Sequence, residues 1–198
     1  EIIESNAFYK CTGLEKIVWN NSLKEIGYSA FFECTGLTGE LNLPENLEKI
    51  EDYAFSKCKW INGELKIPNK IEVIERDAFA GCSNIESIIL PKDLKVIEDS
   101  AFGGCSNLTG NLQIPESVTE IGVSAFAYNG FTYSLIIPDS VEYIYDYAFD
   151  SNGFNGTLTL GKNLKSVGNN AFLNNSFVGD LIIPDSVESI GDGSFSRN

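Results

Sequence analysis

The chain has 198 residues, and its 28 acidic and 14 basic residues give a net charge of -14 at pH 7. A chain this acidic repels phosphate backbones and anionic lipid surfaces, so we expect no nucleic acid and no membrane surface among its partners. The sequence contains no apolar run of about 18 residues, so no membrane insertion is expected within this segment.

A small residue followed by phenylalanine recurs nine times, at intervals of 23 or 24 residues. The steps are Ala7-Phe8, Ala30-Phe31, Ala54-Phe55, Ala78-Phe79, Ala101-Phe102, Ala125-Phe126, Ala148-Phe149, Ala171-Phe172 and Ser194-Phe195. This period is typical of a solenoid, because one such unit cannot bury its apolar side without stacking on the next. We therefore expect residues 1–198 to form one solenoid domain of about eight repeats. Because the chain begins and ends within a repeat, we also expect it to be a piece of a longer protein.

Each repeat contains a three-residue segment with apolar outer residues and a variable middle residue, 13 positions before the small residue of the Ala-Phe step. These segments are 17–19, 41–43, 65–67, 88–90, 112–114, 135–137, 158–160 and 181–183. Such alternation predicts a short strand, and the eight strands should stack as a parallel sheet. In six of the eight repeats proline follows directly. Proline ends the strand, because it has no N–H to donate to the ladder.

The residues after the strand predict the rest of the coil. Leu47 and Ile50 have the spacing of three that turns both side chains inward, and the following Ala54-Phe55 step is predicted to lie in a short helical turn on the outer side. The distance from strand to alanine is constant, so all variation in repeat length lies before the next strand. We interpret that segment as a tolerant loop.

The five cysteines share one column of the repeat, and asparagine continues it. The column is Cys11, Cys34, Cys58, Cys82, Cys105, Asn129, Asn152, Asn175 and Asn198. A slot that accepts both side chains needs a small group able to hydrogen-bond a buried turn, so we interpret the cysteines as structural free thiols. The wide cysteine spacing and the lack of histidine argue against zinc, and no metal or cofactor is expected. The asparagine repeats also carry a phenylalanine two residues later, which predicts a repacked corner.

The order of residues resembles that of the BspA-type leucine-rich repeat family. Leu14-Glu15-Lys16-Ile17-Val18-Trp19 fits the L-x-x-L-x-L core of leucine-rich repeats, and Ile114-Pro115, Val118, Ile121-Gly122 and Ala125-Phe126 carry the subfamily pattern. The resemblance covers the whole chain. It implies an α/β-type repeat solenoid, with a parallel β-sheet on the concave face and short helical turns on the other side. It also implies a secreted or surface-attached protein, an adhesin for extracellular host proteins.

The middle residues of the strands are the first candidate binding site. In a short strand between two inward residues, these side chains should face solvent on the concave sheet, which such solenoids use for binding. The candidate ligand-binding residues are Val18, Asn42, Lys66, Ile89, Gln113, Ile136, Thr159 and Ile182. Their mixture of apolar and polar side chains suits a protein surface. We therefore expect a non-catalytic, protein-binding, adhesin-like module with a protein partner.

Other residues leave alternatives open. Tyr128, Tyr133, Tyr143, Tyr145 and Tyr147 form a local concentration of aromatic side chains with polar tips, which makes them a second candidate binding site. Glu51, Glu75 and Glu98 share one column and could attract calcium or a basic partner, or simply lie in solvent. The chain has no histidine, which excludes the usual catalytic triads. The alternatives to a binding module are a structural spacer that displays another domain and a glycan-processing enzyme using surface carboxylates.

Overall fold

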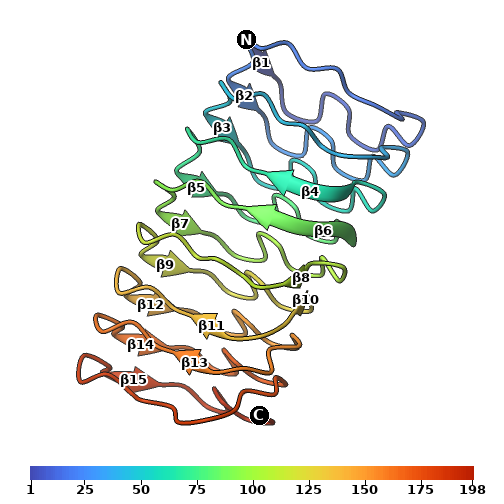
Figure 1. Cartoon of the computed structure of the whole chain (residues 1–198). Helices are drawn as coiled ribbons and strands as arrows, with labels where there is room; N and C mark the ends of the chain where they lie inside the picture. The colour runs from blue at the N-terminus through green and yellow to red at the C-terminus, as the bar shows by residue number, and fades with distance from the viewer.

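Nine strands of two residues each lie along one side of a solenoid in the computed structural model, which describes residues 1–198 (Figure 1). They are β1 (Ile2–Ile3), β2 (Glu25–Ile26), β3 (Lys49–Ile50), β5 (Val73–Ile74), β7 (Val96–Ile97), β9 (Glu120–Ile121), β12 (Tyr143–Ile144), β14 (Ser166–Val167) and β15 (Ser189–Ile190). The first three form one sheet and the other six form another, all in parallel pairs. Their outward surface is called the nine-strand face below. These two sheets were not predicted from the sequence, which placed strands only at the eight three-residue segments.

Six further strands lie on the other side of the coil (Figure 1). They are β4 (Asn62–Lys66), β6 (Asn84–Ile89), β8 (Thr109–Gly110), β10 (Gly130–Phe131), β11 (Leu135–Ile136) and β13 (Leu158–Thr159). They form three parallel pairs, β4 with β6, β8 with β10 and β11 with β13. The termini lie at opposite ends of the stack, and the chain contains no helix long and apolar enough to cross a membrane.

The predicted eight-stranded sheet is therefore only partly formed. Regular strand occupies four of the eight predicted segments, those in β4, β6, β11 and β13. Each segment is only three residues long, with proline often directly after it and a loop of variable length before it. Few backbone hydrogen bonds between neighbouring strands can form in so short a segment. The register shift between Gly63 and Glu64 leaves Glu86 of β6 without a partner and falls in the predicted variable loop.

The predicted helical turns are wrong. The structure contains no helix, and the Ala-Phe step lies in a series of tight turns instead. Cys34 N–H donates to Phe31 O three residues earlier (3.1 Å), whereas Phe31 N–H donates to Ala54 O of the next repeat (2.8 Å). Ser29 and Glu33 have φ values of 51° and 53°, in the left-handed region. A right-handed helix cannot continue through such residues, and the turns bond to their neighbouring repeats instead.

The core is organised around a continuous column of stacked phenylalanine rings. Its nine rings are Phe8, Phe31, Phe55, Phe79, Phe102, Phe126, Phe149, Phe172 and Phe195. Phe102, for example, is fully buried, with centroids 5.5 Å from Phe79 and 5.6 Å from Phe126. One cluster of 47 buried residues surrounds the column and runs without a break from Leu23 to Phe172.

A second, shorter stack of rings accounts for the two types of repeat. Phe131, Phe154 and Phe177 stack on one another, with centroids 6.1 and 5.5 Å apart. Each also meets the ring of its own repeat edge-on, as Phe154 meets Phe149 at 71°. The asparagine repeats thus fill this corner with a ring where the cysteine repeats use a leucine or isoleucine such as Ile85. This is the predicted repacked corner.

The cysteine column forms the hydrogen bonds expected of its slot. The Cys58 Sγ–H donates to the carbonyl oxygen of Phe31, one repeat earlier, at 3.0 Å. In the asparagine repeats, Asn152 Nδ2 donates to the equivalent carbonyl, that of Phe126, at 2.9 Å, and also to its own Phe149 O at 3.1 Å. Either side chain therefore links successive turns, which explains why the column tolerates both residues.

We expect four of the five thiols to be protected from alkylation. Cys34, Cys58, Cys82 and Cys105 are buried, and no cysteine is in a disulfide, whereas Cys11 is exposed. Burial raises the pKa of Cys34 to about 11 and those of Cys58 and Cys105 to about 12. Because the thiolate is the reactive form, these groups are poor nucleophiles near neutral pH. Mass spectrometry after native iodoacetamide treatment should find one rapid label, on Cys11, and four more only after unfolding.

The control is Cys11→Ser, which should lose the rapid label and keep the four slow ones. Rapid modification of Cys58 or Cys82 in the native protein, or a disulfide between them, would contradict the buried column.

Candidate binding surfaces

The structure exposes every predicted strand-middle residue. The outward surface formed by Val18, Asn42, Lys66, Ile89, Gln113, Ile136, Thr159 and Ile182 is called the L-x-L face below. The apolar members are well exposed, with Ile136 at 59% and Ile182 at 77% of full accessibility. The residues beside most of them point inward, as Leu135 and Ile137 do on either side of Ile136. The outer residues are buried or half-buried in seven of the eight segments, whereas in the last one, at the C-terminal end of the stack, Leu181 and Ile183 are each 41% exposed.

Strand pairing aligns these side chains across neighbouring repeats. β4 and β6 place Lys66 opposite Ile89, and β11 and β13 place Ile136 opposite Thr159. Paired strands lie about 4.8 Å apart, so such side chains form contiguous pairs. Lys66 supplies the only charge of the eight side chains, and its Nζ pairs with Glu45 at 2.6 Å. The face thus combines apolar and neutral polar groups on a rigid backbone, which is chemistry suited to contact with another protein.

The five candidate tyrosines do not form one group. Only Tyr143 and Tyr145 contact each other as rings, with centroids 6.5 Å apart, and both project from β12 and the residue that follows it. Tyr133 lies between β10 and β11, on the other side of the coil, where its N–H donates to Asn155 Oδ1. Tyr128 lies close to Asp150, which raises the pKa of its phenol. Residues close in sequence can lie far apart here, because each repeat of 23 or 24 residues carries the chain once around the solenoid.

Tyr143 and Tyr145 lie among charged side chains on the nine-strand face. Tyr145 Oη donates to Glu120 Oε2 at 3.3 Å. Burial, followed by the charge of Glu120, raises the pKa of Tyr145. Lys165 Nζ lies 5.6 Å from the Tyr143 ring centroid and forms an ion pair with Glu142 at 2.6 Å. Lys165 of the protein itself therefore already makes a cation–π contact with one ring of the tyrosine pair, that of Tyr143.

The glutamate column does not act as a unit. The Lys49 ammonium, 2.7 Å away, holds the pKa of Glu51 below its ordinary value. Burial, followed by the charge of Glu98, raises the pKa of Glu75 instead. The chain has no group of three or more His, Cys, Asp or Glu side chains placed to hold a metal ion. Glu51 and Glu75 therefore occupy different electrostatic environments.

A second aromatic group was missed in the sequence. It consists of Tyr9, Tyr28, Phe32 and Tyr53, in the first three repeats. Tyr9 stacks on Phe32 at 5.2 Å, and Lys57 Nζ lies 5.0 Å from the Phe32 centroid. Glu33 pairs with both Lys10 and Lys57, so the two ammonium groups beside these rings share one carboxylate. The available signal was the aromatic residue after the core phenylalanine in two successive repeats, Phe8-Tyr9 and Phe31-Phe32.

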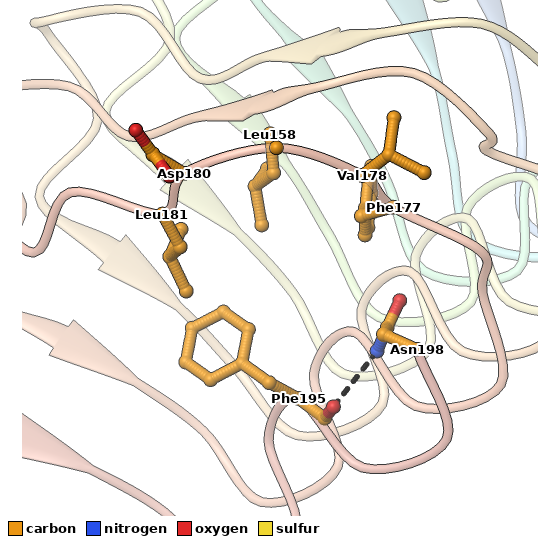
Figure 2. A pocket seen from close by; sticks show the side chains of 8 residues that line it. Leu158, Phe177, Val178, Asp180, Leu181, Phe195 and Asn198 are labelled. Carbon is orange, nitrogen blue, oxygen red and sulfur yellow. Dashed lines mark hydrogen bonds between the residues drawn. The ribbon is translucent and has the colours of Figure 1, made fainter.

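A hollow at the C-terminal end of the stack is lined mainly by core positions (Figure 2). Its lining is Leu158, Phe177, Val178, Gly179, Asp180, Leu181, Phe195 and Asn198. Figure 2 shows the bond from Asn198 Nδ2 to Phe195 O (2.9 Å), which repeats that of Asn175 to Phe172. The counterparts of Phe177 and Phe195 one repeat earlier, Phe154 and Phe172, are fully buried. The hollow is thus a cross-section of the core, and it does not identify a ligand site.

Three solved bacterial leucine-rich repeat proteins share this fold. The chain is 25% identical to one from Bacteroides ovatus ATCC 8483, with a TM-score of 0.62, covering 98% of this chain and 62% of that one. It is 23% identical to a leucine rich cell surface protein from Faecalibacterium prausnitzii A2-165, with a TM-score of 0.63 and the same coverages. It is 26% identical to the T. pallidum leucine rich repeat protein, with a TM-score of 0.50, covering 99% of this chain and 69% of that one.

Two of these structures are much longer than the chain, which spans 62% of their length. Among curated proteins, none is similar enough to count as a match. The family described as "BspA type Leucine rich repeat region (6 copies)" matches residues 1–132 and 72–198, which together include every residue. The phenylalanine column, the cysteine and asparagine slot and the stacked parallel strands are the physical form of that repeat, and the chain belongs to the BspA-type leucine-rich repeat family.

Proposed function

We propose that this chain is a non-catalytic, adhesin-like module of a cell-surface or secreted protein, and that it binds an extracellular host protein through the L-x-L face. The observation that carries the proposal is the row of eight exposed side chains on successive repeats, seven of which lie between buried or half-buried neighbours. The family is one of repeat scaffolds, and the neighbour from F. prausnitzii is a cell surface protein.

The physical argument rests on rigidity and composition. The inward residues on both sides of Ile136 are almost fully buried, so its backbone position is fixed before a partner arrives. A preorganised surface loses little conformational entropy on binding. Ile89, Ile136 and Ile182 expose apolar area to water, which a partner would bury, and Gln113 and Thr159 supply hydrogen-bonding groups between them. Solenoids use such extended surfaces for protein recognition.

We expect the double variant Gln113→Asp/Ile136→Asp to bind an immobilised extract of host extracellular-matrix proteins at least about tenfold more weakly than the unmodified chain. The new carboxylates would need to be desolvated in any interface that covers them. Both side chains are exposed, so the thermal midpoint should not change. Surface plasmon resonance measures the binding, and circular dichroism the thermal midpoint.

The matched control is Tyr143→Ser/Tyr145→Ser, which alters the nine-strand face and should retain most of the binding. Selective loss in the tyrosine variant would move the site to that face. If the unmodified chain binds nothing in the extract, the result favours a structural spacer that displays another domain.

A further inference from the structure

A notch interrupts the nine-strand face between β7 and β12. It has a volume of about 120 Å³ and is lined by Val96, Ile97, Glu98, Asp99, Glu120, Gly122 and Tyr145. Its floor is bare backbone, because Gly122 occupies the position that Glu98 and Tyr145 fill in the repeats on either side. A Cβ at residue 122 would lie 2.6 Å from Asp99 N and from Glu98 C, so a side chain there would clash with the preceding repeat.

The walls of the notch offer both apolar and anionic surface. Val96 and the ring of Tyr145, which is 43% exposed, supply the apolar part. Glu98 and Glu120 form no ion pair, whereas Asp99 pairs with Arg76 at 3.4 Å. The lining contains no lysine or arginine. Two carboxylates without a cationic partner therefore lie beside an aromatic ring whose phenol already bonds to one of them, Glu120.

We propose that this notch binds a lysine or arginine side chain presented by a protein partner. The aliphatic stem of the incoming residue packs against Val96 and the Tyr145 ring, and its cationic head lies between Glu98 and Glu120. Lys165 already makes the analogous contact with the neighbouring Tyr143 ring from within the protein. The net charge of -14 adds long-range attraction for a basic segment.

This surface is distinct from the one proposed for the main function. The notch lies on the side of the coil that carries β7, β9 and β12, whereas the L-x-L face lies on the side that carries β4, β6, β11 and β13 (Figure 1). A partner could therefore occupy one face and leave the other free. The acidic column recognised in the sequence includes Glu98, but the site depends equally on the missing side chain at Gly122 and on the ring of Tyr145.

The test uses a decalysine peptide as probe and isothermal titration calorimetry at physiological salt. Glu98→Gln/Glu120→Gln should lower the affinity at least about fivefold more than Glu64→Gln/Glu86→Gln. Glu64 and Glu86 are exposed residues that form no ion pair. Both double variants lose the same two charges, so the difference between them isolates the notch from general attraction. Tyr145→Ala, which keeps the net charge, should also weaken binding.

Equal losses in the two double variants would overturn the proposal, as would an unchanged affinity in Tyr145→Ala or failure of the unmodified chain to bind decalysine. A fully acetylated decalysine peptide should not bind, and binding of that peptide would also contradict recognition of the charge. Thermal midpoints within about a degree or two of the unmodified chain would exclude unfolding as the cause of any loss.

Discussion

Replacing Phe102 with alanine should lower the free energy of unfolding by about 3 to 5 kcal/mol, the usual cost of removing a large core ring. Phe102 is fully buried and stacks between Phe79 and Phe126, at 5.5 and 5.6 Å. The cavity would open in the middle of the ring column, where neither neighbouring repeat can move in without losing its own stacking. Urea denaturation followed by circular dichroism measures the change.

Phe8→Ala is the matched control, because it makes the same chemical change at the end of the column. Phe8 is 38% exposed and stacks on Phe31 alone, with centroids 5.0 Å apart. In a solenoid, stability is close to a sum over repeats and the interfaces between neighbours, so a terminal ring contributes less. Equal shifts in the urea midpoint for the two variants would contradict this nearest-neighbour picture.

The core was predictable because the period of the sequence directly aligns residues that touch. Once Phe79, Phe102 and Phe126 are placed in one column, stacking is the only arrangement that buries all three, and the rings stack as expected. The slot shared by Cys58 and Asn152 was predictable for the same reason, since both residues had to serve one environment. Column-by-column reading thus identifies inward-facing residues well.

The backbone conformation was less predictable. The turns that replace the predicted helices depend on left-handed residues at two columns of each repeat, and one of these holds Lys10, Glu33, Lys57, Gly81, Gly104, Tyr128, Ser151, Asn174 and Arg197. Only the glycines and the asparagine in that column favour positive φ, so the signal is diluted by residues that do not. The strands of the nine-strand face were missed because two residues are too few to show alternation.

The two candidate sites also differ in how well the sequence predicts them. Exposure of Ile136 and its column follows from alternation within one repeat, which the sequence shows directly. The notch at Gly122 requires Glu98 from the repeat before and Tyr145 from the repeat after. Glycine is common at the position of Gly122 in the family pattern, so the sequence of this repeat alone does not indicate a site. Its effect appears only when three successive repeats are compared in space.

Gly161→Ala should destabilise the protein by about 1 to 3 kcal/mol, the usual cost of inserting an atom into a packed site. Six other repeats have proline at the position of Gly161. Comparison of the repeats alone therefore suggests that glycine is not required there. The structure predicts the opposite. A Cβ at residue 161 would overlap the carbonyl oxygen of Pro138 and lie 2.9 Å from Asp139 Cα, both backbone atoms.

The neighbouring hydrogen bonds prevent an easy escape from this overlap. Lys162 N–H donates to Asp139 Oδ1 at 2.9 Å, and Asn163 Nδ2 donates to Asp139 O at 2.8 Å, so the two chain segments are held together on the far side of the glycine. Gly13→Ala is the matched control, since a Cβ there meets nothing within 4 Å, and it should leave stability unchanged or raise it by up to about 1 kcal/mol. Chemical denaturation of both variants gives the comparison. A Gly161→Ala protein as stable as Gly13→Ala would show that the contact with Pro138 relaxes freely, and Gly161→Pro should then be tolerated as well.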